Sequence, residues 1–411
     1  MPTSQPLIGI VEAKSRELTV LSGTLDASEA WVVVRDDDAT AGYHQLTGWE
    51  STEDLIDSAL HAAANASTYR AWTTGGGAEV KATVIICTVG TNPLLPRAVE
   101  AVLAQQHAHF ELIVVDNAPF TGRVPAALSS IDDPRLRIVD APRAGLSHAR
   151  NAGVDAARGE IIAFTDDDAQ VHPGWLSALL DVFAADHAEQ ADHAIGAVTG
   201  PVFPAELKHE SQCFFEARGG FPKTLEPTVW AAGHPTEDAA RFGVPGDGGP
   251  LFPVTTARVG AGVSMAFRRH VLAQMGPFDT RLGAGTKTCG GEDLDSFARV
   301  LRLGYVIVTT PDAVIHHVHR RDFDGLMKQT YGDGAGMAAL LTKSVLTHPA
   351  SLLTLARRVP AIARRVAPGS ERITGTEPGV PPELTRNEVR GFLRGPWLFL
   401  AEALKQRRLR R

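Results

Sequence analysis

The stretch "EIIAFTDDDAQVHPGWLSALLDVFAA", residues 160–185, joins a short apolar run to three consecutive aspartates and an amphipathic segment. The run "EIIAFTD" is typical of a buried β-strand, and "PGWLSALLDVFAA" is typical of a helix that opens with Pro173. Three adjacent carboxylates repel one another, so the chain either leaves them in water or offers them a cation to hold. The stretch therefore predicts a strand, an acidic turn and a helix, with the aspartates where the strand ends.

From residue 82 onward, apolar runs alternate with amphipathic segments. Nearly continuous Val and Ile runs between helices predict an α/β fold, in which helices cover both faces of a mostly parallel sheet. The expected strands include "TVIICT" (83–88), "ELIVVD" (111–116) and "RLRIVD" (135–140), and the expected helices include "LPRAVEAVLAQ" (95–105) and "LSHARNAGVDAA" (146–157). Ligands of such sheets bind beyond the carboxyl ends of the strands, so Asp116 and Asp166 would face the same crevice.

The glycine cluster in "TTGGGAEVKA", residues 73–82, predicts a linker between two domains. Residues 1–75 are expected to form a small α+β accessory domain, because a strand pattern precedes a helix start signal at Ser51. Residues 82–345 form the main domain, and long loops are expected over 203–257, which are rich in Gly and Pro. The remaining residues, 346–411, predict a basic amphipathic helical tail.

Charge is distributed unevenly along the 411 residues. The formal net charge is −7, but residues 352–411 contain 13 Lys and Arg against 5 Glu and carry +8, so the preceding 351 residues carry −15. A body this acidic is a poor general binder of nucleic acid. The beginning of the sequence lacks the pattern of a secretory signal, and no apolar run approaches the roughly 20 residues of a membrane span. We therefore expect a cytoplasmic protein, with Cys87, Cys213 and Cys289 as reduced thiols.

Two aspartate triplets occur, and they receive different interpretations. In an extended segment, Asp166 and Asp168 would share one side, with Asp167 opposite, which suits a hard divalent cation. The alternative is an acidic turn that favours the dipole of the following helix. The other triplet, residues 36–38, has no acidic or His cluster nearby and predicts a solvated hairpin turn.

Two further groups of residues have the composition of a site. Gly290 and Gly291 precede Glu292, Asp293 and the helix pattern "LDSFARVLRLG". The acidic residues could simply favour the helix dipole. Alternatively, the glycines bring the backbone close to a ligand and one carboxylate acts as a general base.

The second group is "VIHHVHRRD", residues 314–322. On a strand, His317 and His319 would face one way and His316 the other. Two imidazoles on one side could complete a metal site or hold a phosphate. A buried, hydrogen-bonded histidine is the commoner outcome for any one of them.

Six segments in order resemble the family 2 glycosyltransferases with the GT-A fold, over roughly residues 82–345. They are "VIICT" (84–88), "ELIVVDNAP" (111–119), "GLSHARNAGVDAARGEIIAFTDDD" (145–168), "GAGVSMAFRRHVLAQMGPFD" (260–279), "GGEDLDSFARVLRLGY" (290–305) and "PDAVIHHVHRR" (311–321). The resemblance implies an enzyme that moves a sugar, with inversion, from a nucleotide-diphosphate donor to a hydroxyl acceptor: a glycan, a lipid-linked molecule or a small molecule.

The resemblance also implies roles for individual residues. Asp166 and Asp168 look like the DxD motif that binds Mn²⁺ or Mg²⁺, with His317 and His319 beside the metal and diphosphate. Asp293 looks like the catalytic base, with Glu292 as its neighbour. The residues implied in binding the donor are Thr88, Asp116, Arg150, Asp166 and Asp167. These roles suit the reaction, since negative charge develops on the leaving diphosphate while the acceptor hydroxyl loses a proton.

Some alternatives stay open. After the first strand, relatives often carry a charged residue such as Arg, whereas this chain has "CTVGTNP" (87–93), so UDP, GDP and dTDP donors are all possible. A non-catalytic scaffold of the same fold could bind a sugar nucleotide or a polysaccharide. A metal-dependent phosphohydrolase is disfavoured, because neither a nucleophile signature nor a water-activating base accompanies the aspartates.

The basic tail also has two interpretations. It places Phe392, Leu393, Trp397, Leu398 and Leu400 among many arginines. Residues 386–411 could lie peripherally in the anionic inner face of the cell membrane, which would suit a lipid-linked acceptor. Otherwise the apolar face packs on the protein.

Overall fold

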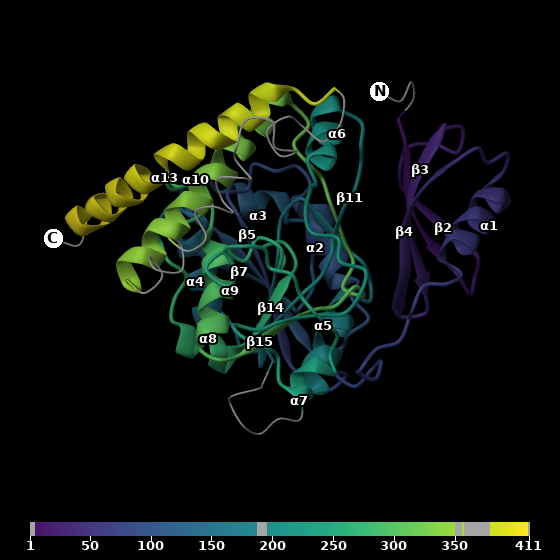
Figure 1. The fold of residues 1–411 in the computed structure, drawn as a ribbon, viewed down its shortest axis with the longest axis horizontal. Coiled ribbons are helices and arrows are strands. Elements are labelled where there is room, and N and C mark those ends of the chain that lie inside the picture. Colours follow the sequence, from purple (N-terminus) through teal and green to yellow (C-terminus); the bar gives the residue numbers. More distant parts are fainter. Residues whose placement is uncertain (1–4, 187–194, 350–355, 357–378, 410–411) are drawn as a thin grey trace.

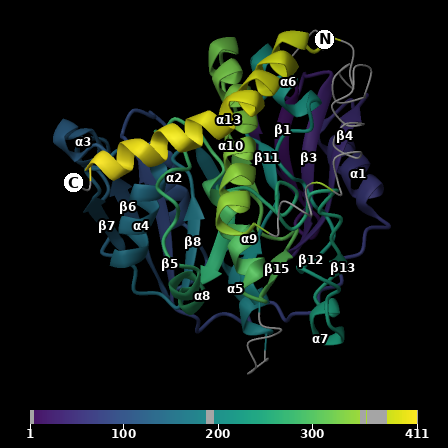
Figure 2. The same ribbon diagram turned by 60° about the vertical axis from the view of Figure 1, so that its left-hand side comes forward.

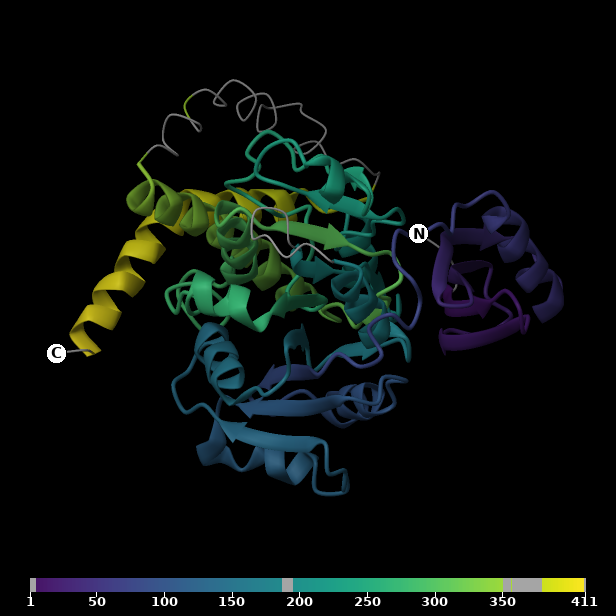
Figure 3. The ribbon, with the colours of Figure 1, turned by 90° about the horizontal axis from the view of Figure 1, so that it is seen from below.

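The computed structural model describes residues 5–186, 195–349, 356 and 379–409 (Figure 1). The first four strands and one helix form a separate layered unit at one side of the molecule (Figure 3). Its sheet has the order β2-β1-β3-β4, and its elements are β1 Leu7–Glu12, β2 Glu17–Ser22, β3 Glu29–Asp36, β4 Ala39–Thr47 and α1 Thr52–Ala63. Ser51 caps α1 by accepting a hydrogen bond from the backbone N–H of Asp54, as its sequence signal predicts.

The main sheet has nine described strands in the order β13-β12-β15-β10-β14-β8-β5-β6-β7. Its strands are β5 Ala82–Thr88, β6 Phe110–Asp116, β7 Leu136–Asp140, β8 Ile161–Thr165, β10 Ile195–Thr199, β12 Thr228–Trp230, β13 Val244–Pro245, β14 Met265–Arg268 and β15 Val306–Thr309. Parallel pairs outnumber antiparallel ones, and β14 runs antiparallel to both neighbours. The expected α/β fold with a mostly parallel sheet is confirmed.

Helices cover both faces of this sheet, because alternate strand residues point to opposite sides. Val84 and Ile86 of β5 face the core formed with α2 (Leu95–Leu103) and α5 (Trp175–Ala184). Ile85 faces the second core, which includes residues of α4 (Leu146–Ala156), α8 (Arg269–Met275) and α9 (Glu292–Arg302). The helix expected to open at Pro173 begins two residues later, at Trp175, because the segment before it forms a turn in which Trp175 N–H bonds to His172 O.

A second, three-stranded sheet lies beside the main one, in the order β11-β16-β9. Its strands are β9 Ala169–Val171, β11 Val202–Pro204 and β16 Ile315–His317. The segment expected to contain only long loops, 203–257, also contains α6 Glu210–Ala217, α7 Glu237–Ala240 and two short strands. Short elements escape a composition argument because glycine and proline flank them closely. The connection after β6 contains η1 Pro119–Thr121 and α3 Arg123–Ala127.

Two long helices, α10 (Phe323–Thr347) and α13 (Pro382–Leu409), cross at close range (Figure 2). A Cβ at Gly391 of α13 would lie 2.1 Å from Tyr331 O, so glycine is what permits this backbone approach. The part of the predicted tail in residues 350–355, 357–378 and 410–411 lies outside the described residues. None of the described helices is long and apolar enough to cross a bilayer.

The N-terminal unit docks on the main body through buried charge. Asp312, between β15 and β16, accepts two hydrogen bonds from the guanidinium of Arg70 and one from Thr40 N–H. Arg35, which is almost fully buried, donates to Asp312 O and to Thr40 Oγ1. Tyr43 of β4 packs on Phe203 of β11, with ring centroids 4.6 Å apart. The unit therefore supports the small sheet that contains β16.

Removing the carboxylate at this junction should destabilise the protein. Asp312→Asn leaves two buried guanidinium groups without their counter-charge, which typically costs about 3 kcal/mol. The free energy of unfolding, measured by urea denaturation, should fall by about that amount. The matched control is Asp37→Asn, which breaks an exposed ion pair with Lys14 and should change stability by less than about 1 kcal/mol. Equal midpoints for the two variants would contradict the docking role.

Candidate functional site

The carboxyl ends of the central strands meet at one edge of the sheet (Figure 3). Thr88 of β5 is paired with Asp116 of β6, and Asp116 is paired with Asp140 of β7. Asp166 follows Thr165, the last residue of β8, which pairs with Ile86. The crossovers thus deliver one chemically capable side chain after another to the same edge.

The aspartate triplet forms a tight turn between β8 and β9, not the extended segment that was expected. Ala169 N–H donates to Asp166 O at 3.3 Å, because β9 turns back to pair with β16. The turn still brings Asp166 and Asp168 to one side. Their carboxylate oxygens and a ring nitrogen of His317 lie within 4.8 Å of one another. Sequence analysis therefore grouped these three residues for a partly wrong reason.

Asp167 points away from this group. Its two carboxylate oxygens accept hydrogen bonds from Thr88 Oγ1 and from Asn92 Nδ2, the latter at 3.0 Å. Thr88 Oγ1 also accepts from Gly90 N–H at 2.9 Å. Asp167 and Thr88 thus tie the loop after β5 to the acidic turn.

His317 reaches the aspartates because β16 pairs with β9, placing His317 opposite Ala169. Its Nε2 lies 3.0 Å from Asp168 Oδ1, and its Nδ1 lies 3.2 Å from His319 Nδ1. His319 in turn contacts Glu216 Oε1 through Nε2 at 2.8 Å. Among the described residues, His319 therefore lies behind the Asp166–Asp168–His317 cluster and is not one of its three members.

The three groups of the cluster influence one another's charge. Burial, followed by the neighbouring Asp168, raises the pKa of Asp166 to about 6. Burial also acts to raise the pKa of Asp168, but the contact with His317 outweighs it and the pKa falls. Burial acts to lower the pKa of His317, whereas Asp168 raises it, and the net direction is upward. Two buried carboxylates that share positive charge in this way form a donor set suited to a hard cation.

A buried ion pair lies next to the cluster. Arg150 of α4 donates from Nη1 to Glu292 Oε1 at 2.9 Å, and both side chains are less than a tenth exposed. Burial acts to lower the pKa of Arg150, but Glu292 and Asp166 raise it. Burial raises the pKa of Glu292 against the opposing effect of Arg150. Arg150 thus links the acidic turn electrostatically to the start of α9.

Asp293 is less enclosed than Glu292. Its Oδ2 accepts a hydrogen bond from Gly262 N–H at 3.0 Å and its Oδ1 accepts from Leu294 N–H at 2.8 Å. The side chain is partly exposed, so it remains accessible to a second molecule. Gly262 O also accepts from Arg150 Nη2, at 3.4 Å, so one residue contacts both groups.

The two glycines before Glu292 do not serve a ligand as the sequence suggested. A Cβ at Gly291 would lie 2.8 Å from Gly336 O of α10, and the backbone there has φ of +90°. The missing side chains make room for α10, so the reason for glycine is helix packing.

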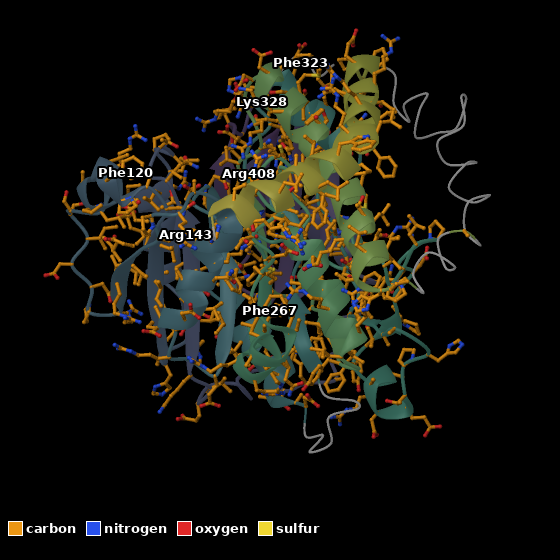
Figure 4. The ribbon with its side chains drawn as sticks, turned by 90° about the vertical axis from the view of Figure 1, so that its left-hand side faces the viewer. Phe120, Arg143, Phe267, Phe323, Lys328 and Arg408 are labelled. Carbon is orange, nitrogen blue, oxygen red and sulfur yellow. The ribbon has the colours of Figure 1, made fainter. Side chains whose placement is uncertain are left out.

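Asp116 is almost fully buried at the end of β6. Its Oδ1 accepts from Ala118 N–H at 2.9 Å, and its Oδ2 has no hydrogen-bond partner among the described residues. Phe120, four residues later, is 83% exposed and projects at the edge of the molecule (Figure 4). An acceptor without a partner and an exposed aromatic ring thus lie on the same connection.

Sequence analysis missed several supporting residues, namely Asn92, Glu216, Lys223 and Gly262. Glu216 holds both His319 and Lys223, the latter at 2.8 Å, and burial is outweighed by these partners so that its pKa is lowered. Nothing in the sequence around Glu216 marks it, because its partners come from distant segments. Asn92 was the one that could have been found, since it directly follows a strand that ends at the candidate site.

Comparison with known proteins adds independent findings. Residues 83–238 match the family model described as "Glycosyl transferase family 2". The chain is 26% identical over 264 residues to a glucosyl-dolichyl phosphate glucuronosyltransferase of Haloferax volcanii, a match that covers 62% of this chain and 75% of that protein. It is also 26% identical over 238 residues to an "Inactive polypeptide N-acetylgalactosaminyltransferase-like protein 5" of Mus musculus, covering 56% of this chain and 51% of that one.

One solved structure with a similar fold is a mannosyltransferase from Pyrobaculum calidifontis in complex with GDP-Man and Mn²⁺. The match has 18% sequence identity and a TM-score of 0.46, and it covers 79% of this chain and 90% of that one.

Proposed function

Because this chain is a family 2 glycosyltransferase through residues 83–238, we propose that it transfers a sugar, with inversion, from a nucleotide-diphosphate donor to a hydroxyl acceptor. The observation that carries the proposal is the Asp166–Asp168–His317 cluster, which lies at the carboxyl edge of the sheet with Arg150 linking it to the start of α9. The cluster suits a divalent cation and the start of α9 supplies a base. Both are needed for this reaction.

The donor set fits Mn²⁺ or Mg²⁺. Two carboxylates and one imidazole converge, their atoms lie within 4.8 Å of one another, and two of the three side chains are nearly buried. Asp166, Asp168 and His317 would hold the ion, leaving other positions for the oxygens of the donor. When bound, the ion would neutralise the charge that grows on the leaving diphosphate. His319 and Glu216 orient His317 from behind.

Asp293 is the base in this proposal. Its carboxylate is partly exposed and is held in place by Gly262 N–H, so it can take the proton of the acceptor hydroxyl. Glu292 has another task, because it is buried and paired with Arg150. It holds the guanidinium in position beside the acidic turn. Asp116 Oδ2 would accept from the nucleotide base once the residues that cover it move aside.

A panel of sugar nucleotides tests the proposal. We expect one class among UDP-, GDP- and dTDP-sugars to raise the thermal midpoint, and only when Mn²⁺ is present. A ligand at a hundred times its Kd stabilises the folded state by about 2.7 kcal/mol, which a thermal-shift assay resolves easily. Equal shifts with and without metal would contradict the assigned cluster. Binding without any transfer to a hydroxyl acceptor would favour the scaffold alternative.

We further propose that α13 contacts an anionic membrane surface and that the acceptor is lipid-linked. The helix packs one side on the protein through Leu384 and Phe399, which are buried. Its other side exposes Leu393, Trp397 and Leu404, at 69%, 74% and 58%, beside several arginines. An exposed apolar strip with flanking cations suits the interface of an anionic bilayer. The Haloferax volcanii relative, whose name specifies a dolichyl phosphate substrate, supports the same direction.

The membrane contact predicts a measurable loss of vesicle binding. The double variant Leu393→Ser and Trp397→Ser should weaken co-sedimentation with phosphatidylglycerol vesicles at least tenfold, since burying one large apolar side chain contributes about 1.5–3 kcal/mol. The control is Tyr69→Ser, which removes a 77% exposed aromatic ring far from α13 in the sequence. Equal binding by all three proteins would contradict a membrane role for this face.

A further inference from the structure

A second cavity lies apart from the site described above. It has a volume of about 520 Å³ and is bounded by the segment 277–281 and by residues of α9, α10 and α13. None of the residues assigned to the donor, the metal or the base lines it. Its lining includes four cationic side chains, which come from four different parts of the chain: Arg281, Arg299, Lys343 and Arg407.

Positive charge exceeds negative charge around this cavity. Asp279 pairs with Arg281 at 2.6 Å and with Lys343 at 2.9 Å. Asp295, buried behind the wall, pairs with Lys343 at 2.7 Å and with Arg299 at 2.8 Å. Two carboxylates thus serve three cations, and Arg407 at the rim adds a fourth. Burial acts to raise the pKa of Asp279, but Arg281 and Lys343 outweigh it and the pKa falls, so the charges are all present at neutral pH.

The cations also retain donors that the protein does not use. Arg299 Nη1 donates to Met275 O and Pro277 O, each at 2.9 Å. Arg299 Nη2 is buried and has no hydrogen-bond partner among the described residues. Arg281 spends Nε and Nη2 on Asp279. A buried guanidinium nitrogen without an acceptor is costly, so its presence in the wall of a cavity marks a place for an external anion.

We propose that this cavity binds a phosphate-bearing anion. Guanidinium groups match phosphate oxygens in a two-pronged geometry, and a doubly charged group gains most from several converging cations. The volume exceeds that of a bare phosphate, so the phosphate would belong to a larger molecule. Ala403 and Arg407 bring α13 into the wall, so either a free phosphorylated small molecule or the headgroup of a lipid could enter.

The site has a structural connection to the proposed base. Asp293 lies in the first turn of α9, and Asp295 and Arg299 lie further along the same helix. An anion that engages Arg299 would therefore stabilise the helix that positions Asp293. The cavity proposal does not depend on the transfer reaction, and its test needs no sugar donor.

The test is a calorimetric titration with sn-glycerol 3-phosphate in buffer that contains EDTA, so that no divalent ion can recruit phosphate to the acidic turn. We expect saturable binding that Arg407→Gln weakens about tenfold, the usual effect of losing one charge-assisted contact. The matched control, Arg408→Gln, removes the adjacent arginine of α13, which is exposed and does not line the cavity (Figure 4). It should bind like the parent chain.

A second variant, Ala403→Phe, fills the cavity and leaves every charge in place, so it should also abolish binding. A short-chain, water-soluble phosphatidylglycerol forms the other arm of the experiment. Binding of either probe that both cavity variants weaken supports the proposal, and the probe that binds identifies the source. Failure of both probes to bind the parent chain, or binding that neither Arg407→Gln nor Ala403→Phe alters, would overturn it.

Discussion

Asp293→Asn is expected to lower kcat by about 10²- to 10⁴-fold and to leave donor affinity nearly unchanged. The range is that of general acid–base catalysis, because asparagine keeps the shape of the side chain but cannot take a proton at neutral pH. The amide can still accept the hydrogen bond from Gly262 N–H, so the start of α9 should keep its geometry. A loss confined to kcat would indicate an interaction that matters only in the transition state.

The measurement combines release of nucleoside diphosphate with donor titration in the presence of Mn²⁺. Asp324→Asn is the matched control, since Asp324 also lies in the first helical turn of a helix, α10, and is exposed. It should behave like the parent enzyme. Weakened donor binding together with substantial residual transfer by the Asp293 variant would assign this carboxylate to the donor and leave the base unidentified.

Asp168→Ala should abolish the metal-dependent stabilisation by the donor. The carboxylate is one of three converging ligands and the direct partner of His317, so its loss leaves two separated groups that cannot hold a divalent cation tightly. The increase in thermal midpoint that the donor and Mn²⁺ produce in the parent chain should disappear.

The shift with ligand must be compared with the unliganded midpoint of the same variant, because removing Asp168 also changes the environment of His317. The control uses the other aspartate triplet. Asp37→Ala alters an exposed turn residue between β3 and β4 and should leave the donor response intact. An unchanged response in Asp168→Ala would place the metal elsewhere.

Much of the fold could be predicted from local sequence patterns. Val84, Ile85 and Ile86 predict a strand buried on both faces, and they do contribute to two separate cores. The Ser51 cap and the helix of α9 were also predicted from nearby residues. Such features depend on interactions between residues a few positions apart, so the pattern that causes them is visible in the sequence.

Conformation within a turn was predicted less well. The aspartate triplet was expected to be extended, and its turn arises because β9 pairs with β16, whose residues come about 145 positions later. Likewise, Gly291 was interpreted as making room for a ligand, whereas α10 occupies that space. In both cases a distant segment, absent from any local pattern, decided the geometry.

The sequence by itself determined the order of strands and helices, and with it which side chains end each strand: Asp116 and the aspartates after β8. Only the tertiary structure decided the partnerships of charge. Arg150 with Glu292, His319 with Glu216, and Asp312 with Arg70 each join residues more than 100 positions apart. Periodicity encodes burial because neighbours share a helix or strand. An ion pair depends on how distant elements pack, and no local pattern carries that information.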